Sequence, residues 1–511
     1  METLAKASLS GNPLNKKLPR SQLSAEAEPY QPLARQATAP YPYPSKSRAA
    51  GDWAVNIPPS PTATYVPPSV DPRHRPARPR SRSRSRARGE ERGRYTGRGP
   101  DKHEWDAPPV IERALHAASV SVIQGLTVPV ELYRGLRDTY YPPPGRPDIV
   151  KAYPVRRRLP VRIFFPSHHD LTSPALLPTL FTIHGGGFTV GSAADDDAWN
   201  RSFSDSYTVL VIALNYGKAP WAVFPTPLLD AEALYHAALN DESLPIDRMR
   251  TALCGFDAGG NLALALAQLP SVRTGYDPSG HAAHAREYTT HPYPHQPPRS
   301  HPPPAGVVSV CGILDFSTTA ARKARTRPYK RQLRGPRGWG PGLDWMARML
   351  PSSAWSYIPY GHDVADPLLS PAYAGRAELP PHVFVIAAEL DCLAHESWRT
   401  ACAWAGRAVP DADVLVGRRG PSRWRGCLDD GRGENGVKFG WSETHARSGA
   451  GGSVPGSTRW LLVPDVVHGF DSPGWRNKYL WGDEEARMDS EMKTIAYQRE
   501  LAEWLWGTVW R

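Results

Sequence analysis

Apolar runs of strand length alternate with segments of helical spacing through most of this chain from about residue 159 onward. The apolar runs predict strands at 159–166, 177–187, 207–217, 250–255, 305–316, 382–391 and 458–470. Helical spacing predicts helices at 225–240, from Ala258 onward, at 394–408 and at 489–507. Buried strands that alternate with helices predict an α/β fold with a mostly parallel sheet and helices on both faces. In such sheets, ligands bind at the carboxyl ends of the strands.

The pattern changes before residue 107, where few apolar residues cluster. Residues 1–105 are rich in Pro, Ser and Arg and are predicted to be a disordered leader. Order is expected to begin with the segment 107–138, whose apolar residues have helical spacing. These residues are Val110, Ile111, Leu115, Ala118 and Val122. Residues 106–511 are therefore predicted to form the folded domain.

Two low-complexity stretches interrupt this domain. Residues 271–304 are rich in His and Pro, and residues 418–457 are rich in Gly and Arg. Both are predicted to be insertions, the first a surface loop and the second a disordered segment. Long structureless loops are uncommon inside compact domains, so these stretches make the neighbouring boundaries harder to predict.

The net charge of +11 is concentrated in the leader, where residues 73–98 alternate Arg with Ser. Such a tract is typical of a solvated tail, and no recognition fold accompanies it, so a nucleic-acid partner is not required. The five cysteines stand singly, which favours a reducing compartment over a disulfide framework. The start of the chain lacks the apolar core of a signal peptide, and no apolar run reaches membrane-spanning length. A cytoplasmic protein with no transmembrane segment is predicted.

The first candidate site is the sequence HGGGF at 184–188, directly after an apolar run. Consecutive glycines leave backbone amides open to a ligand, and such amides can stabilise a developing oxyanion. The amides of Gly185 and Gly186 are the candidates for this role. A flexible glycine turn is the alternative interpretation.

The second candidate is the sequence GFDAGG at 255–260, which predicts a strand, a tight turn and a helix. Asp257 lies at the apex of the turn, and the amide of Ala258 is predicted to face the same oxyanion as the glycine amides. This arrangement is typical of a nucleophile elbow. An aspartate that caps a helix is the alternative interpretation.

Two further candidates follow later strands. Asp391 ends the apolar run 382–391 and is predicted to orient a histidine, with a helix cap as the alternative. The run 458–470 predicts a strand that ends in a loop. His468 lies in this loop and is followed by Gly469 and Phe470. The chain order is nucleophile position, acid and histidine, which is the order of the α/β-hydrolase triad.

These motifs together resemble the α/β-hydrolase fold and, within it, the hormone-sensitive-lipase-like esterases and lipases (the alpha/beta hydrolase fold-3 group). The resemblance covers roughly residues 108–507 without the two insertions. The matching sequences are HGGG (184–187), NYGKAP (215–220), FPTPLLDA (224–231), GFDAGGNLA (255–263), DPLLSP (366–371), ELDCLAHE (389–396) and HGF (468–470). The resemblance further implies a small helical cap formed by about 108–140 and 317–363.

One residue departs from the family pattern, because the family has a serine where this chain has Asp257. Acyl-serine chemistry therefore cannot be transferred. An ionised carboxylate is itself a nucleophile. The haloalkane dehalogenases and epoxide hydrolases, which are other α/β-hydrolases, use an aspartate at this apex to attack a saturated carbon, after which a His–acid pair activates water.

Two functions therefore remain open. The chain is predicted to be a hydrolase of a small carboxylic ester or a related electrophile, with Asp257 at the nucleophile position. The alternative is a catalytically silent relative that binds a small ligand or a protein, because an anionic Asp257 would repel an oxyanion and favour imidazolium at His468. No metal or cofactor is expected. The sequence gives neither the substrate nor the oligomeric state.

Overall fold

The computed structural model describes Trp105 and residues 108–511, except 142, 144, 274–300, 339–343, 429–430, 434–435, 437 and 450–451. By its contacts the chain divides into residues 1–89 and 90–511, and every described residue lies in the second unit. The predicted disordered leader, apart from Trp105, lies outside the described residues. So do most of the predicted insertion 271–304 and part of the predicted insertion 418–457.

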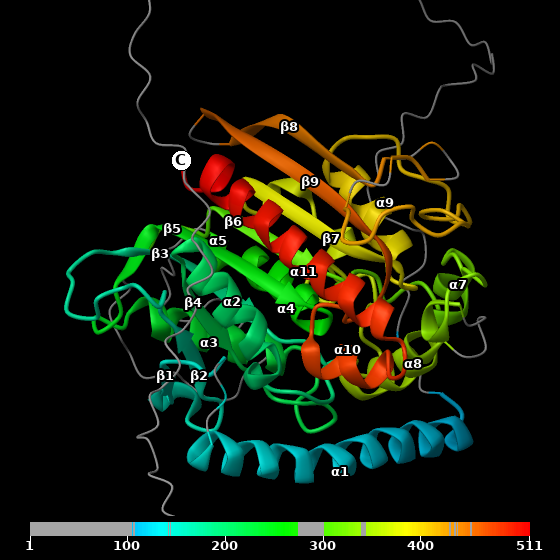
Figure 1. Cartoon of the computed structure of the whole chain (residues 1–511), viewed down its shortest axis with the longest axis horizontal. Coiled ribbons are helices and arrows are strands. Elements are labelled where there is room, and N and C mark those ends of the chain that lie inside the picture. The colour runs from blue at the N-terminus through cyan, green and yellow to red at the C-terminus, as the bar shows by residue number, and fades with distance from the viewer. Residues whose placement is uncertain are drawn as a thin grey trace, which may run out of the picture. The chain divides into compact units, whose positions relative to one another are not determined.

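A nine-stranded sheet forms the centre of this unit, with the strand order β1-β2-β4-β3-β5-β6-β7-β9-β8 (Figure 1). The strands from β4 to β9 in this order pair in parallel, while β1, β2 and β8 add antiparallel edges. The strands are β1 Ile149–Lys151, β2 Val161–Phe164, β3 Leu177–Ile183, β4 Leu210–Leu214, β5 Ile246–Phe256, β6 Gly306–Val310, β7 His382–Leu390, β8 Gly440–Gly449 and β9 Gly452–Val467. The predicted mostly parallel sheet is confirmed.

Helices connect these strands and cover both faces of the sheet. They are α1 Val110–Tyr140, α2 Asp197–Tyr207, α3 Thr226–Leu239, α4 Ala258–Gln268, α5 Pro270–Arg273, α7 Ala320–Arg325, α8 Trp345–Tyr357, α9 Ala394–Trp404, α10 Pro473–Tyr479 and α11 Glu484–Trp504. Parallel neighbours in a sheet need such crossover connections, which is why strands and helices alternate in the sequence.

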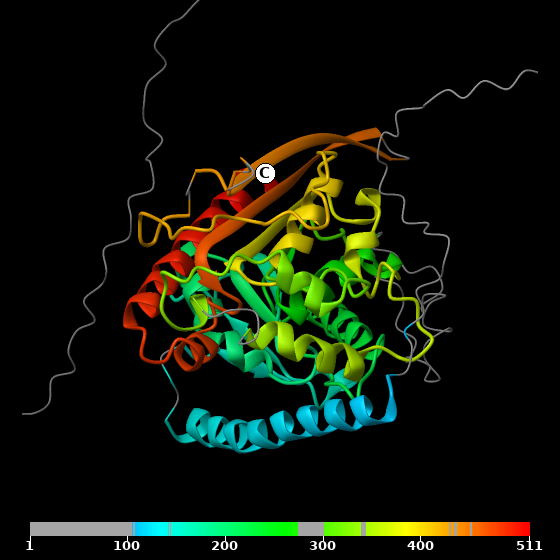
Figure 2. The same cartoon turned by 90° about the vertical axis from the view of Figure 1, so that its right-hand side faces the viewer.

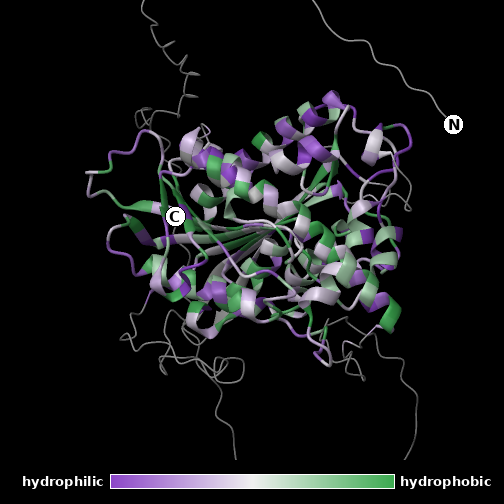
Figure 3. Cartoon of the chain, turned by 90° about the horizontal axis from the view of Figure 1, so that it is seen from below, coloured by the Kyte–Doolittle hydropathy of each residue, from purple (hydrophilic) through white to green (hydrophobic). Residues whose placement is uncertain are grey.

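The two faces of the sheet pack into two separate apolar clusters. On β3, Phe181 and Ile183 join the cluster formed with α3, α4 and α9, while Leu180 joins the cluster formed with α2 and α11. Successive strand residues point to opposite faces, so a strand covered on both sides must be apolar throughout. Figure 3 shows these apolar strands at the centre and more polar helices around them.

All of the predicted strands and helices listed above are confirmed, with ends that differ by a few residues. Five elements were missed: the strands β1 and β8 and the helices α2, α5 and α10. The prediction of disorder over 418–457 is wrong for its second half, because β8 pairs with β9 along an antiparallel ladder from Gly440↔Leu461 to Gly449↔Gly452. The many glycines and arginines of this segment resemble a disordered sequence, and apolar residues are too few in it to show the alternation typical of a strand.

Helix α1 has the predicted helical form, but its predicted apolar face is exposed. Ile111, Leu115 and Val122 are 76%, 62% and 61% exposed. By length and composition alone, the segment Val110–Asp138 is apolar enough to cross a membrane. The prediction of no transmembrane segment did not consider this helix, because polar residues interrupt its apolar ones. A single candidate of this kind is weak evidence for a membrane span.

The opposite face of α1 packs against α8 (Figure 2). His116 Nδ1 lies 3.0 Å from Ser352 Oγ, and the Gln124 amide donates to the carbonyls of Thr189 (3.0 Å) and Ala219 (2.8 Å). The two segments expected to form a cap are thus in contact. Their role as a cap over a binding site stays a prediction.

Candidate active site

Asp257 lies at the tight turn between β5 and α4, as the sequence predicted. Its backbone has φ 50° and ψ −117°, a conformation that residues with a side chain seldom adopt. No hydrogen bond from the Asp257 side chain caps α4, so the alternative of a helix cap loses its support. Strain at a single residue is often found at functional sites.

The glycines around this turn allow α4 to approach the strands closely. A Cβ on Gly259 would lie 2.0 Å from the carbonyl oxygen of Ile183, and one on Gly255 would lie 1.9 Å from the carbonyl oxygen of Gly259. Both distances are impossible for real atoms. These two positions therefore require glycine, and the close packing that they permit fixes Asp257 at the carboxyl end of β5.

The Asp257 carboxylate faces the glycine loop after β3. Its Oδ2 accepts hydrogen bonds from the amides of Gly186 (3.0 Å) and Gly187 (2.7 Å). Gly186 and Gly187 both have positive φ, 109° and 55°, which aims successive amides at one point. The backbone amide pair at this carboxylate is therefore Gly186 and Gly187.

The sequence predicts the amides of Gly185, Gly186 and Ala258 as an oxyanion hole for a bound substrate, and this role stays a prediction. Gly185 packs against Asp257, where an added Cβ would lie 3.1 Å from the Asp257 Cβ. Within the described part of the chain, no hydrogen bond joins Gly185 or Ala258 to the carboxylate. The sequence did not single out Gly187, because the φ angles that turn its amide toward the carboxylate are not visible in the sequence.

Side chains behind the glycine loop hold it in place. The Tyr216 hydroxyl donates to the carbonyl of Gly185 (3.0 Å), and the Tyr216 ring stacks on the imidazole of His184 with centroids 4.4 Å apart. Burial lowers the pKa of His184 well below its usual value, and the nearby Lys218 charge acts in the same direction. A neutral His184 that carries its proton on Nδ1 donates to the Gly185 carbonyl (2.7 Å) and accepts at Nε2 from the Lys218 ammonium (3.1 Å).

His468 and Asp391 meet at the ends of β9 and β7. Asp391 Oδ2 lies 2.8 Å from His468 Nδ1, and both side chains are buried. The second Asp391 oxygen accepts from the amide of Leu393 (3.1 Å), which fixes the carboxylate at the start of α9. The predicted pairing of these two residues is present in the structure.

The imidazole lies between the two carboxylates. His468 Nε2 is 3.5 Å from Asp257 Oδ1, longer than an ordinary hydrogen bond. Burial would lower the pKa of His468, but the charge and hydrogen bond of Asp391, with the charges of Asp257 and Asp471, raise it to about 9. The imidazole is therefore cationic at neutral pH. Asp257, His468 and Asp391 converge on one place, as the sequence predicted.

Two buried acids near this place were missed. Burial raises the pKa of Asp471. The Tyr497 hydroxyl donates a hydrogen bond to its carboxylate (2.6 Å), which acts against this shift. Burial and the neighbouring acids Asp195 and Asp471 raise the pKa of Asp196 well above its usual value. Asp471 follows His468 by three residues and could have been noticed in the sequence HGFD. Nothing in the sequence distinguishes Asp196 from the acids beside it.

Cys311 is a further neighbour that the sequence did not single out. Donor atoms of Cys311, Asp391 and His468 lie within 4.8 Å of one another, all buried. Burial raises the pKa of the Cys311 thiol well above its usual value, and Asp391 adds to this effect. A thiol must lose its proton to bind a metal, and the Asp391–His468 hydrogen bond already uses the other two donors. This group is therefore poorly suited to hold a metal.

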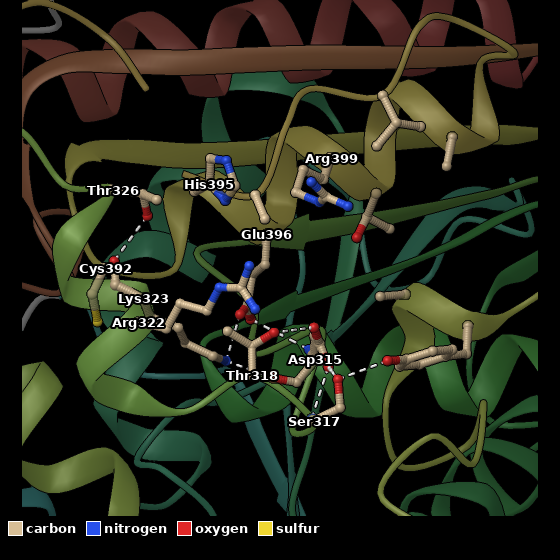
Figure 4. A pocket seen from close by; sticks show the side chains of 16 residues that line it. Asp315, Ser317, Thr318, Arg322, Lys323, Thr326, Cys392, His395, Glu396 and Arg399 are labelled. Atoms are coloured by element: carbon tan, nitrogen blue, oxygen red, sulfur yellow. Dashed lines mark hydrogen bonds and ion pairs between the residues drawn. The ribbon is translucent and has the colours of Figure 1, made fainter. Parts of the chain in front are cut away.

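A separate polar cavity of 280 Å³ lies beside the start of α9 (Figure 4). At its wall the buried Lys323 ammonium forms an ion pair with Glu396, whose other oxygen accepts from the amide of Leu314 (2.8 Å). Burial raises the pKa of Glu396 to about 7, although Lys323 acts against this shift. The lining includes Cys392, next to Asp391 in the chain, but none of Asp257, Asp391 and His468. This cavity is distinct from the place where those three residues meet.

Comparison with known proteins gives matches over the same region. Residues 180–412 match a family model described as alpha/beta hydrolase fold. The arylacetamide deacetylase of Oryctolagus cuniculus is 36% identical over 132 residues, which are 25% of this chain and 32% of that protein. The ethyl acetate hydrolase of Pseudomonas putida is 40% identical over 118 residues, 22% of this chain and 36% of that protein. The chain thus matches about a third of the length of these relatives.

Among solved structures, an esterase of Pyrobaculum calidifontis has a TM-score of 0.47 and 20% identity, covering 79% of this chain and all of that one. The matched range 180–412 contains the glycine loop, the turn with Asp257 and the strand end with Asp391, and the sheet has parallel strands with helices on both faces. Residues 180–412 thus form an α/β-hydrolase region, which matches the hormone-sensitive-lipase-like fold-3 group.

Proposed function

We propose that this chain is a hydrolase of small carboxylic esters or related electrophiles, with Asp257 as its nucleophile. The observation that carries this proposal is the unequal surroundings of the two Asp257 oxygens. Oδ2 accepts from two backbone amides, while Oδ1 is buried, has no hydrogen-bond partner in the described part of the chain and faces His468. One oxygen is anchored by hydrogen bonds, and the other keeps its lone pairs unused beside the imidazole.

The same contacts make direct attack on a carbonyl carbon unfavourable. The amides of Gly186 and Gly187 are the groups that would hold the oxyanion of an ester carbonyl, and the Asp257 carboxylate already occupies them. Attack by Asp257 on that carbonyl would also form a mixed anhydride of high energy. The preferred electrophile is therefore a saturated carbon, as in an epoxide, a haloalkane or the alkyl carbon of an activated ester.

For an epoxide, the first step forms an ester on the protein. Oδ1 of Asp257 attacks the ring carbon, the ring C–O bond breaks, and the resulting alkoxide takes a proton. His468 can supply this proton, because its pKa of about 9 keeps the imidazole protonated at neutral pH. The step leaves a neutral Asp257 ester beside a neutral imidazole.

The second step cleaves that ester. The neutral His468, oriented by Asp391 at 2.8 Å, takes a proton from water, and the hydroxide attacks the Asp257 carbonyl carbon. The negative charge then develops on Oδ2, where the amides of Gly186 and Gly187 stabilise it. Collapse of the intermediate breaks the ester C–O bond, the leaving alkoxide takes the proton of the new Asp257 carboxyl, and the diol leaves with the carboxylate and the imidazolium restored. The anchoring of Oδ2 thus supports a role in this step.

One observation favours a second candidate, a catalytically silent relative. The two amides are satisfied by Oδ2 of Asp257, and the positive His468 lies beside its Oδ1. A site that holds its own carboxylate in this way can persist for stability alone. A silent chain would keep the fold and bind a ligand or a partner instead.

The test compares the purified chain with Asp257→Asn, Asp257→Ser and His468→Ala on short acyl esters, epoxides and haloalkanes. Asp413→Asn, an exposed aspartate, serves as the matched control. The proposal expects turnover of an epoxide or haloalkane that Asp257→Asn lowers by roughly 10³-fold or more, while Asp413→Asn leaves it unchanged. One turnover in heavy-oxygen water should then label Asp257, which mass spectrometry detects.

Two results would contradict the proposal. If the parent chain hydrolyses nothing and Asp257→Ser gains esterase activity, the silent relative is the correct interpretation. If the parent turns over substrate without labelling Asp257, the carboxylate acts as a base on water rather than as the nucleophile.

A further inference from the structure

Helix α1 carries an apolar stripe on the face that points away from the rest of the structure. Its residues recur every three or four positions, as one face of a helix requires. They are Ile111, Leu115, Ala118, Val122, Leu126, Pro129, Tyr133, Leu136 and Tyr140, and all of them are exposed. A contiguous exposed apolar surface of this kind usually marks a binding site for another apolar surface.

The inner face of α1 buries Val120 and carries polar side chains that contact the neighbouring elements. His116 contacts Ser352, Gln124 donates to two backbone carbonyls, and Arg134 forms an ion pair with Asp195. These contacts hold the inner face against the rest of the structure and leave the apolar stripe on the outer face. At 1.5 Å per residue, its 31 residues form a rod about 46 Å long.

The sequence that precedes this helix is strongly basic. Residues 73–98 contain eleven arginines and two glutamates, and Arg98 precedes Val110 by twelve residues. Arg113, Arg134 and Arg137 lie on α1 itself and are only partly buried. Basic segments next to an apolar helix face are attracted by the negative charge of anionic lipids.

We infer that the outer face of α1 docks on the surface of an anionic lipid bilayer. The helix lies in the plane of the interface, with Leu115, Leu126 and Leu136 in the acyl boundary and the arginines of residues 73–98 at the headgroups. Tyr133 and Tyr140, near the end of the stripe, are residues that favour this interface. The inference does not rest on the proposed hydrolase activity.

Two other arrangements would use the same helix. A transmembrane span would require the contacts of His116, Gln124 and Arg134 with the rest of the structure to break, and it would place these side chains in hydrocarbon. A second copy of this chain could cover the stripe, but it would add a second basic tract and not the negative charge that the first one attracts. The lipid surface satisfies both the apolar stripe and the positive charge.

The experiment measures co-flotation of the full chain with phosphatidylcholine vesicles, with and without phosphatidylserine. The test variant carries Leu115→Glu, Leu126→Glu and Leu136→Glu. The matched control carries Leu171→Glu, Leu176→Glu and Met249→Glu, which are equally exposed but lie outside α1. A third variant replaces the eleven arginines of residues 73–98 with glutamine. Circular dichroism checks that each variant is folded.

The inference expects binding that is stronger with phosphatidylserine, a loss of roughly tenfold or more in the α1 variant, and no loss in the control. The arginine variant should lose the preference for phosphatidylserine. Failure of the parent chain to float, or equal flotation of the α1 variant, overturns the inference.

The two other arrangements have their own readouts. Light scattering that finds a dimer, and a monomer only for the α1 variant, shows that a second copy covers the stripe and overturns the inference. Resistance of the cellular full chain to alkaline carbonate extraction indicates a span and overturns it too. Release by carbonate supports docking in the plane of the interface.

Discussion

Two groups of buried charges in this molecule differ in how completely they are neutralised. In the first, Lys330 is wholly buried and donates to Glu389 (2.6 Å) and Asp465 (2.5 Å). The amides of Asp465 (2.8 Å) and Arg418 (2.6 Å) donate to the Glu389 oxygens as well. Burial still raises the pKa of Glu389, although Lys330 acts against it. Every charged oxygen of Glu389 has a donor.

The second group surrounds His468, where Asp257, Asp391 and Asp471 share one imidazole. One oxygen of Asp257 has no hydrogen-bond partner in the described part of the chain. The excess negative charge is what raises the pKa of His468 to about 9 against the effect of burial. Perturbed and incompletely paired groups are characteristic of functional sites, whereas fully paired networks are more often structural.

The two groups are nevertheless connected through one strand. Asp465, held by Lys330, has φ 52° and precedes His468 by three residues at the end of β9. Lys330 comes from the segment between α7 and α8, so the paired group ties that segment to the loop that carries the imidazole. We therefore expect a structural role for the group around Lys330 and a chemical role for the group around His468.

The largest expected effect tests the paired group. Lys330→Met leaves Glu389 and Asp465 buried without their cation, so we expect the free energy of unfolding to fall by about 3–5 kcal/mol. Urea unfolding followed by circular dichroism measures this change. Lys478→Met, at an exposed lysine, should change stability by less than about 0.5 kcal/mol. A small loss in Lys330→Met would mean that this group is not the structural one.

The second effect is the pH dependence that comes from His468. Its pKa is raised from 6.5 to about 9 in the folded chain, so the protonated imidazole stabilises the fold. This contribution is fully present below about pH 6.5 and is lost as the pH rises through about 9; it amounts to roughly 3 kcal/mol. Other groups titrate in this range as well, so the quantity to measure is the difference between the parent and His468→Gln.

That difference in unfolding free energy should shrink by about this amount between pH 6 and pH 10. A difference that stays constant over this range would show that the imidazole is not surrounded by uncompensated negative charge. The contrast between the two groups would then disappear.

Much of the fold could be predicted because its strands are buried on both faces. The runs that became β3, β4 and β7 are continuously apolar, so their length and boundaries are visible without any knowledge of contacts. β8 was missed for the opposite reason: it lies at the edge of the sheet, pairs on one side with β9 and carries a polar sequence. Helix α1 shows a different limit, because helical spacing reveals that a face exists but not whether it is covered.

The site residues that could be predicted are those that directly follow a buried strand. Asp257, Asp391 and His468 each follow a buried strand, and parallel strands bring their carboxyl ends to one edge. Which glycine amides face the Asp257 carboxylate depends on backbone angles, and the burial of Asp196 depends on packing. Neither property leaves a signal in a single sequence, and the role of these residues in catalysis stays a prediction.

The smallest expected effect is the one that separates the two groups most clearly. In Asp257→Asn the amide oxygen can still accept from Gly186 and Gly187, while one negative charge leaves a group that holds an excess of them. The loss of attraction to His468 and the relief of repulsion from Asp391 and Asp471 act in opposite directions. We expect a change in unfolding free energy of less than about 1 kcal/mol, together with a lower His468 pKa in an NMR titration. If Asp257→Asn instead destabilised the chain as much as Lys330→Met, the carboxylate would belong to a structural network, and the case for its chemical role would lose its physical basis.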